Sequence, residues 1–500
     1  MSKPKSAWLS DTALLIYIAL ATVIVHWITG HQYGFQRDEL ATLEDSRHLD
    51  WGFVAYPPIT PFFGRLSLIL FGTSLAGFRF FAAVAEAIAV VLTGLMAREI
   101  GGGRAAQLIA AAAAIPFCLA GGAMMQYVSF DYLFWVLAAY FVVKLLKTQD
   151  PRWWLGIGAA IGLGLESKYT MGFFAIAIAA ATLLTDARRY YKSKWLWYGV
   201  GLSILIFLPN LIWQTRNHFI SLDFLQHIHA RDVRIGRAKK FLPEQLKLTL
   251  GGIFLALAGL YFTLFSRDGK RFRMLAWMYL IPFALFIVAK GRAYYLAAAY
   301  PMLYAAGSVW LEQMSTRAGS VARNAIRKLV WIVLVADAAI MGSITLPIAA
   351  ADSPWATRAM KINEDYREEI GWPELVETIA KVRDALPAED RAHFGILAGN
   401  YGEAGAVNLY GPAYGLPPVI SGVNSFWQKG YGDPPPQTLI VVGRDLDELQ
   451  DHFASCRLAA HTWNRFHVLN EETRAHPNIF VCRTLLQPWP EYWKTARHFG

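Results

Sequence analysis

Long apolar segments recur through the first 347 residues of the chain and set the strongest limit on its fold. A helix needs about 20 apolar residues to cross the hydrocarbon core of a bilayer. Residues 12–30 and 76–97 reach this length, and further apolar segments follow. Only 17% of the residues are charged, whereas an average soluble protein carries about 25%. The sequence therefore predicts an α-helical polytopic membrane protein with about eleven transmembrane helices.

Short basic clusters follow every second predicted span, for example Arg98 after the second and Lys144 after the fourth. Basic residues concentrate in cytoplasmic loops, so this pattern predicts a cytoplasmic N-terminus. The two long loops, residues 31–75 and 214–243, and the C-terminus then face outward. In a bacterial cell this means a multi-pass inner-membrane protein with a periplasmic C-terminal domain. The net charge of +10 is spread over these clusters, so nucleic-acid binding is excluded.

The first long loop carries the charged run Arg37-Asp38-Glu39 soon after the first span. Within this loop, residues 62–72 are apolar but too short to span, which predicts an interfacial helix. Two adjacent carboxylates beside an arginine, placed where a span leaves the bilayer, indicate a functional site. A solvated loop cluster or a helix cap would explain the same residues.

The composition changes after residue 347, where turn-forming residues typical of a soluble domain begin to appear, as in Gly371-Trp372-Pro373. Residues 374–386 have the pattern of an amphipathic helix, and residues 394–398 and 438–442 that of strands, the second of them followed by a helical segment. We therefore predict two domains, a membrane domain over residues 1–347 and a small α/β domain over 348–500. Of the three cysteines, only Cys456 and Cys482 could pair, and their separation neither favours nor forbids it.

Further polar groups lie at the predicted outer ends of helices. Asp131 opens the fourth span, where a carboxylate is costly unless it faces a cavity or a partner, although a first-turn acid is also favoured by the helix dipole. Lys168 follows a glycine-rich span and would suit an anion, or would extend to the interface. The last polar group consists of Lys290, Arg292, Tyr294 and Tyr295. These residues would form either a phosphate clamp or an interfacial tyrosine belt.

These residues suggest group transfer. Carboxylates can take a proton from an acceptor hydroxyl or amine, and cations can stabilise a departing phosphate. We therefore predict a transferase that uses a lipid phosphate donor entering from the bilayer. A transporter or flippase of lipid-linked sugars is the alternative, but transporters usually place ionisable residues near the bilayer midplane. No nucleotide cofactor is expected, because the glycine run at 101–103 lies on the cytoplasmic side.

The order of these motifs resembles glycosyltransferase family 39, the dolichyl-phosphate-mannose–protein mannosyltransferase-like group. That group includes the bacterial transferase that adds aminoarabinose to lipid A. The motifs are Asp38-Glu39, then Tyr56-Pro57-Pro58, Asp131, Lys168 and the run Lys-Gly-Arg-Ala-Tyr-Tyr-Leu-Ala-Ala-Ala-Tyr-Pro at 290–301. The resemblance covers roughly residues 10–347 and depends on the joint order of short motifs.

The resemblance implies the C-superfamily glycosyltransferase fold, a polyprenyl-phosphate-linked sugar as donor, and a lipid, protein or glycan as acceptor. It assigns Asp38 as base or acceptor-positioning group with Glu39 beside it, and Asp131 as the second acid. The donor phosphate and lipid would be held by Lys290, Arg292, Tyr294 and Tyr295, with Lys168 nearby. Arg37 and Tyr56 of the first long loop would also bind the substrate. Some members place a divalent metal near the site through a histidine, for which His218 is the closest counterpart. The glutamate that partners that histidine has no match here.

Overall fold

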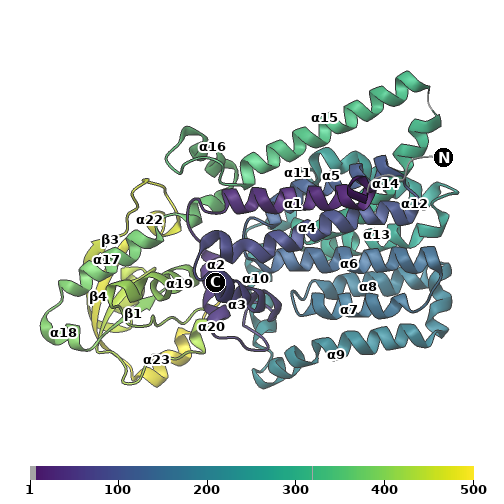
Figure 1. Cartoon of the computed structure of the whole chain (residues 1–500). Helices are drawn as coiled ribbons and strands as arrows, with labels where there is room; N and C mark the ends of the chain where they lie inside the picture. The colour runs from purple at the N-terminus through teal and green to yellow at the C-terminus, as the bar shows by residue number, and fades with distance from the viewer. Residues whose placement is uncertain (1–6, 318) are drawn as a thin grey trace.

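The computed structural model describes residues 7–317 and 319–500. A helical bundle lies at the right of Figure 1, and a smaller part with a β-sheet lies at the left. In chain order, the bundle helices are α1 (Asp11–Thr29), α4 (Leu75–Ile100), α5 (Arg104–Gly121), α6 (Tyr127–Thr148), α7 (Trp153–Leu165), α8 (Met171–Leu183), α9 (Lys194–Arg216), α12 (Ile253–Phe265), α13 (Arg273–Val288), α14 (Tyr300–Arg317) and α15 (Ser320–Thr345).

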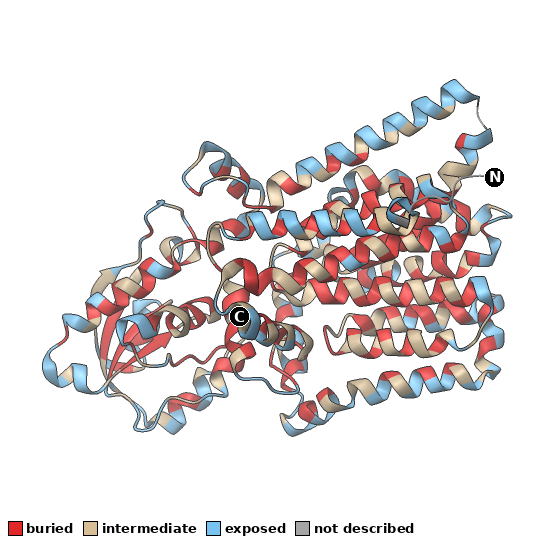
Figure 2. Cartoon of the chain, in the orientation of Figure 1, coloured by how far each residue is buried: buried red, intermediate tan, exposed pale blue. Residues whose placement is uncertain are grey.

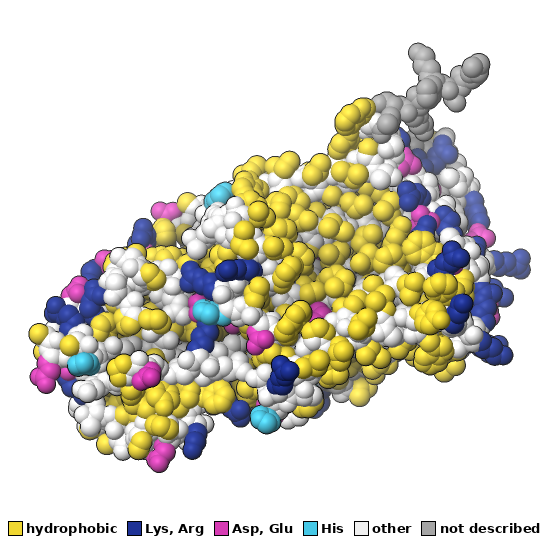
Figure 3. Space-filling view, turned by 60° about the horizontal axis from the view of Figure 1, so that its bottom comes forward, with side chains coloured by type: hydrophobic (Ala, Val, Ile, Leu, Met, Phe, Trp, Pro, Cys, Tyr) yellow, Lys and Arg dark blue, Asp and Glu magenta, His cyan; other side chains and the backbone are white. Residues whose placement is uncertain are grey.

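The bundle confirms the prediction of a polytopic helical membrane protein. Within the described ranges, eight helical segments are long and apolar enough to cross a membrane, or nine if α8 and the bent continuation Asp186–Lys192 form one span. Hydrophobic side chains cover the visible face of the bundle in Figure 3, and Lys and Arg gather at the end away from the sheet. The expected number of about eleven requires that α7, α8 and α14 also cross, and it stays a prediction.

Glycines allow pairs of bundle helices to approach each other closely. A Cβ atom on Gly158 of α7 would lie 2.0 Å from the carbonyl oxygen of Gly199 on α9. On α12, a Cβ atom on Gly259 would lie 2.1 Å from the carbonyl oxygen of Leu303 on α14. Small residues at such contacts are typical of helix packing in membranes, where backbone approach replaces the hydrophobic effect. Figure 2 shows the buried residues in the interior of the bundle, with α9 and α15 more exposed at its margins.

The first long loop of the sequence prediction (residues 31–75, the predicted first outer segment) contains two helices, α2 (Arg37–Arg47) and α3 (Ile59–Phe71). The predicted interfacial helix corresponds to α3. The run Arg37-Asp38-Glu39 forms the first turn of α2, which begins with a capping box. In this box the Gln36 side chain accepts a hydrogen bond from the Asp38 amide at 2.6 Å, and Glu39 accepts one from the Gln36 amide at 3.0 Å. Such reciprocal bonds satisfy amide groups that a helix start leaves unpaired.

The second outer segment is also helical, although the sequence predicted a long loop over 214–243. It consists of α10 (Ile220–Arg234), a 3-10 turn (Arg237–Lys240) and α11 (Phe241–Thr249). The predicted span 246–265 is broken by the 3-10 turn Leu250–Gly252, so that α12 starts only at Ile253. The polar residues of α10 hid its helical character, since an apolar stripe is the signal that sequence analysis uses.

The C-terminal domain, residues 348–500, has a four-stranded sheet in the order β1-β2-β4-β3. The strands β1 (Phe394–Ala398) and β2 (Thr438–Val442) have the predicted bounds and pair in parallel, and β3 (Phe453–His461) and β4 (Asn478–Leu485) complete an antiparallel half. Cys456 and Cys482 face each other across β3 and β4 and form a disulfide. The helical elements around the sheet are α16 (Pro354–Ile362), the 3-10 helix η7 (Glu364–Glu369), α17 (Trp372–Asp384), α18 (Ala388–Ala392), α19 (Tyr401–Tyr410), α20 (Asn424–Trp427), α21 (Leu446–Gln450), α22 (Glu471–Arg474) and α23 (Trp489–Ala496).

The C-terminal domain contacts the first outer segment through α19, which lies against α2. A Cβ atom on Gly402 would lie 2.7 Å from the Cβ atom of Arg37, and one on Gly405 would lie 2.7 Å from the Cβ atom of Leu40. The two glycines are three residues apart and therefore lie on one face of α19. This close contact joins the two parts, and the domain boundary at residue 347 stays a prediction.

A buried arginine ties three segments together beneath α2. Arg79 of α4 donates three hydrogen bonds to Glu39, at 2.9, 3.2 and 2.6 Å, and one to the carbonyl oxygen of Gly34. Its guanidinium also lies 3.4 Å from the carboxylate of Glu369 in η7. Arg79 is 4% exposed and Glu39 is 0% exposed, so each charge depends on the other for compensation.

We expect that Arg79→Met strongly destabilises the protein, by about 3–5 kcal/mol, because Glu39 would remain buried without its partner. The thermal unfolding midpoint of the purified protein in detergent measures this effect. Arg65→Met is the matched control, since Arg65 lies exposed on the neighbouring α3. Equal midpoints for the two variants would contradict the structural role of the ion pair.

Candidate functional site

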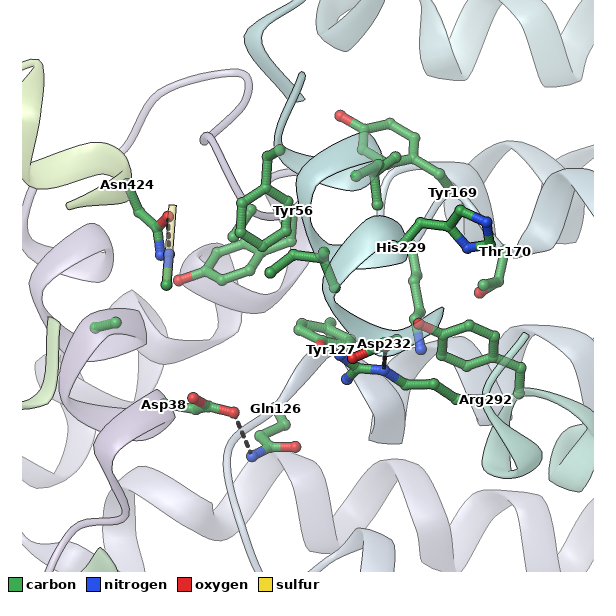
Figure 4. A pocket seen from close by; sticks show the side chains of 18 of the residues that line it. Asp38, Tyr56, Gln126, Tyr127, Tyr169, Thr170, His229, Asp232, Arg292 and Asn424 are labelled. Carbon is green, nitrogen blue, oxygen red and sulfur yellow. Dashed lines mark hydrogen bonds and ion pairs between the residues drawn. The ribbon is translucent and has the colours of Figure 1, made fainter. Parts of the chain in front are cut away.

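A cavity of about 700 Å³ lies between the bundle and the C-terminal domain, within the size range of small-molecule sites. Figure 4 shows side chains from several segments that converge on it. The structure brings together most of the predicted site residues, which line the cavity as follows: Arg37, Asp38, Tyr56, Lys168, Lys290, Arg292, Tyr294 and Tyr295. Residues from distant parts of the sequence therefore share one space.

One face of α2 forms part of the wall. Asp38, Ala41, Thr42 and Asp45 line the cavity, and their spacing of three, four and seven residues places them on a single side of a helix. Two carboxylates two turns apart thus belong to the same wall. Sequence analysis identified only the first of them, although the spacing of Asp38 and Asp45 was a signal that could have shown the second.

Asp38 is held at the cavity wall by two donors. Its Oδ1 atom accepts a hydrogen bond from the hydroxyl of Tyr401 at 2.7 Å. Its Oδ2 atom accepts a longer bond, 3.3 Å, from the side-chain amide of Gln126, and Figure 4 shows these two side chains facing each other. The carboxylate remains partly exposed, so it can accept a proton from a group bound in the cavity.

The other two predicted acids do not line the cavity. Glu39 is enclosed by Arg79 and also accepts a hydrogen bond from the Met125 amide at 2.9 Å. Asp131 is 5% exposed and accepts bonds from the indole of Trp135 at 3.0 Å and from the hydroxyl of Thr170 at 2.9 Å. In this geometry both carboxylates hold neighbouring segments in place, and their catalytic assignment stays a prediction.

Lys168 lies in an aromatic cage. Its ammonium group is 4.8 Å from the ring centre of Tyr127, 4.7 Å from that of Tyr294 and 4.2 Å from that of Tyr295. Rings stabilise a cation without neutralising it. No carboxylate of the described residues forms an ion pair with Lys168, so its charge is available to an anion in the cavity.

Arg292 lies on the same side of the cavity and has a carboxylate partner. Its Nε atom donates to Asp232 of α10, as Figure 4 shows. Asp232 is also 3.6 Å from Arg237 and 3.8 Å from Arg231. One carboxylate thus organises three arginines, and the group keeps an excess of positive charge.

The loop that carries Arg292 begins with an exposed lysine. Lys290 has a φ of 50° and is followed by Gly291, so the chain turns sharply after α13. Burial alone would raise the pKa of Tyr294, but the nearby cations Lys168 and Arg292 hold that pKa below its usual value. The positive electrostatic potential of this wall therefore favours the ionised form of Tyr294, and the same potential would attract an anion bound in the cavity.

Tyr56 is a buried part of the wall. Its hydroxyl donates to the Oδ2 atom of Asp45 at 2.7 Å. Burial raises the pKa of Asp45 to about 7, although the bond from Tyr56 opposes this. Asp45 can therefore carry a proton near neutral pH, unlike an ordinary exposed carboxylate.

Several cavity residues lie outside the catalytic and substrate-binding set predicted from the sequence. His229 and Asp232 belong to α10, and the C-terminal domain contributes a further set: Asp365, Glu368, Tyr401, Asn424, Ser425, Phe426 and Gly500. The positive charge of residues 214–243 is unusual for a loop predicted to face outward, and it indicated that this segment, which contains α10, could face an anionic ligand. Within the C-terminal set, the segments 400–405 and 421–427 carry aromatic residues suited to sugar stacking, but the sequence favoured turn and core residues there, and it gave no signal for Asp365, Glu368 or Gly500.

The predicted metal site does not form in the described parts of the chain. His218 lies in the turn between α9 and α10, with a φ of 54°, and does not line the cavity. No group of three or more His, Cys, Asp or Glu side chains is arranged to hold a metal ion within the described ranges. The described residues therefore offer no such ligand set, the possible metal stays a prediction, and no chemical step is assigned to it.

Comparison with known proteins supports the predicted resemblance. Residues 55–213 match the family described as dolichyl-phosphate-mannose-protein mannosyltransferase. The undecaprenyl phosphate-alpha-4-amino-4-deoxy-L-arabinose arabinosyl transferase 1 of Pseudomonas fluorescens is 25% identical over 271 residues, which cover 50% of this chain and 47% of the relative. The chain thus spans about half the length of the curated relatives that it matches. These matches confirm the resemblance to glycosyltransferases of this group.

Solved structures show the fold. ArnT from Cupriavidus metallidurans, bound to undecaprenyl phosphate, has a TM-score of 0.59 at 16% identity, with 96% of this chain and 99% of that chain covered. The archaeal oligosaccharyltransferase AglB from Archaeoglobus fulgidus, in complex with an inhibitory peptide and a dolichol-phosphate, has a TM-score of 0.50 at 12% identity, with 87% and 70% covered. The chain therefore shares the overall fold of these solved structures.

We expect that Lys168→Gln weakens the binding of an anionic phosphate probe about tenfold, because the variant removes a cation that forms no ion pair with a described carboxylate. A fluorescence titration of the purified protein with a short-chain lipid phosphate as the probe measures this change. Lys494→Gln, at an exposed position of α23, serves as the control and should bind like the wild type. An unchanged affinity of Lys168→Gln would exclude the proposed anion site.

The raised pKa of Asp45 also predicts a pH dependence of stability. Since the folded protein holds this proton more tightly than the unfolded chain, the contribution to stability is full below the ordinary pKa of 3.8 and is lost as the pH rises through about 7. Asp45→Asn should therefore gain stability relative to the wild type between pH 5 and about pH 8. Unfolding midpoints across this range test the sign, with the exposed Asp186→Asn as the control that should stay flat.

Proposed function

We propose that this protein is a bacterial inner-membrane glycosyltransferase that moves a sugar from a polyprenyl-phosphate-linked donor to a lipid, protein or glycan acceptor. The observation that carries the proposal is that Asp38 and the cations Lys168 and Arg292 line one cavity. A base and an anion site in a common space are what a direct transfer from a phosphate leaving group needs. The relatives and solved structures support this proposal, because their names contain undecaprenyl phosphate or dolichol-phosphate.

Two observations support an outward, periplasmic position of the cavity. Lys and Arg gather at the end of the bundle that lies away from the C-terminal domain (Figure 3), and such residues prefer the cytoplasmic side. The disulfide between Cys456 and Cys482 is of a kind that persists in oxidising compartments such as the periplasm. Both favour a cytoplasmic N-terminus and a periplasmic C-terminal domain.

The proposed reaction is a single displacement at the anomeric carbon. The acceptor hydroxyl or amine attacks this carbon while its proton passes to the carboxylate of Asp38. The bond between the anomeric carbon and the phosphate oxygen breaks, and the electron pair leaves with the polyprenyl phosphate. Lys168 and the arginines around Asp232, which include Arg292, then stabilise the negative charge that develops on the phosphate. Attack from the side opposite the leaving group inverts the anomeric configuration.

We expect Asp38→Asn to lower the transfer rate by about 10²–10⁴-fold, because an amide cannot accept the proton. The assay uses the purified full-length protein in detergent, a panel of radiolabelled undecaprenyl-phosphate pentoses and hexoses, and envelope lipid, protein and glycan fractions as acceptors. Release of undecaprenyl phosphate and the appearance of label in an acceptor are both measured. Transport requires two compartments, so activity in detergent separates a transferase from a flippase.

The matched control is Asp223→Asn, since Asp223 is exposed on α10 and lies outside the cavity lining. Full activity of this control with loss in Asp38→Asn supports the assignment. Retained transfer in well-folded Asp38→Asn would remove Asp38 from the mechanism, and no transfer by the wild type from any donor of the panel would contradict the proposed function itself.

A further inference from the structure

The shorter of the two hydrogen bonds to Asp38 comes from the C-terminal domain. The hydroxyl of Tyr401, in the first turn of α19, lies 2.7 Å from Oδ1 of Asp38, whereas the Gln126 amide lies 3.3 Å from Oδ2. Tyr401 itself lines the cavity. The candidate base is thus completed by a residue far from the membrane bundle in the sequence.

Tyr401 is fixed from its own helix. Asn400 accepts a hydrogen bond from the Glu403 amide at 2.9 Å, and Glu403 accepts bonds from the amides of Asn400 and Gly399 at 3.1 and 3.0 Å. This capping box sets the direction of the first turn of α19. The phenol is therefore presented to Asp38 by a rigid helix start rather than by a flexible loop.

Tyr401 is also fixed from α2. The guanidinium of Arg37 lies 5.6 Å from the centre of the Tyr401 ring and forms an ion pair with Glu471 of α22. Gly402 keeps the backbones of α19 and α2 close, since a Cβ atom there would lie 2.7 Å from the Cβ atom of Arg37. The ring has little freedom to leave its position, so its hydroxyl is directed at one carboxylate oxygen.

We propose that Tyr401 is a positioning residue for the transfer reaction: its hydroxyl fixes the rotamer of Asp38 and stabilises the ionised carboxylate, so that the C-terminal domain completes the site. This inference rests on the proposed function. Because Oδ1 is occupied by the strong donor Tyr401, the incoming proton is directed to Oδ2, which accepts only the longer bond from Gln126. Tyr401 keeps its own proton throughout, and the acceptor proton ends on Asp38.

A hydrogen bond to the charged form of a carboxylate favours that form. Besides Tyr401, charged and titratable groups on four other segments interact electrostatically with the carboxylate of Asp38. These groups are Arg37 on α2, Tyr56 before α3, Tyr127 on α6 and Asp365 on η7. Substitution of Tyr401 leaves the others in place, which makes its effect on the pH profile specific.

The test compares Tyr401→Phe with the wild type in the transfer assay, using the undecaprenyl-phosphate sugar of the panel that gives the highest rate. Phenylalanine keeps the ring beneath Arg37 and removes only the hydroxyl. We expect kcat to fall about tenfold, KM for the donor to stay within about twofold, and the acidic limb of the kcat profile to move about one unit to higher pH.

Two further variants make the result decisive. Tyr410→Phe removes a hydroxyl from the same helix outside the cavity lining and should leave rate and profile unchanged. The double variant Asp38→Asn/Tyr401→Phe should be no slower than Asp38→Asn alone, because a residue that acts through Asp38 has nothing left to position. Unfolding midpoints of all variants are measured in parallel.

Each outcome decides between the proposals. If the wild type transfers and Asp38→Asn does not, an unchanged pH profile in Tyr401→Phe overturns the positioning role while the proposed function stands. A raised KM with an unchanged kcat would make Tyr401 a substrate contact, and a lowered unfolding midpoint without a shifted profile would make it a purely structural residue. Inactivity of the wild type towards the whole panel would instead contradict the proposed function.

Discussion

The buried ion pair between Arg79 and Glu39 is the interaction on which the arrangement of the site depends. It joins α4 of the bundle to the first turn of α2, and Glu39 also accepts the amide hydrogen of Met125, one residue before Gln126. The first turn of α2, which carries Asp38, is thereby held next to Gln126, whose side chain donates a hydrogen bond to Asp38. Such a pair is costly to break, since each charge is removed from water. A carboxylate beside the candidate base thus serves to hold the base in place.

The C-terminal domain belongs to the cavity rather than standing apart from it. Its helix α19 packs on α2 through Gly402 and Gly405, and it brings Tyr401 to Asp38. The opposite wall comes from the bundle, where Lys168 is enclosed by tyrosine rings and Arg292 is held by Asp232. The acid and the cations therefore occupy separate walls of one space.

Sequence reasoning selected the residues of the cation wall because they interrupt apolar segments, where a buried charge is costly and therefore informative. Lys168, Lys290 and Arg292 all line the cavity. The same reasoning assigned catalysis to Glu39 and Asp131, since a buried carboxylate looks alike in sequence whether it faces a substrate or a structural partner. Asp45 and Asp232 were missed because they lie in the polar loops between the spans, where a carboxylate is common and stands out less than within an apolar segment. The C-terminal strands β1 and β2 were found from their continuous apolar runs, whereas β3 and β4 were not.

By itself, the sequence determined the membrane class, the helical bundle, the small α/β domain and the order of motifs along the chain. These properties follow from local signals: the length of apolar segments, the placement of basic clusters and the alternation of strand and helix patterns. Only the tertiary structure decided which carboxylate faces the cavity, which cation keeps a free charge, and that Tyr401 reaches Asp38. Those choices depend on contacts between segments hundreds of residues apart, and the direction of a side chain across such a contact leaves no trace in the local pattern.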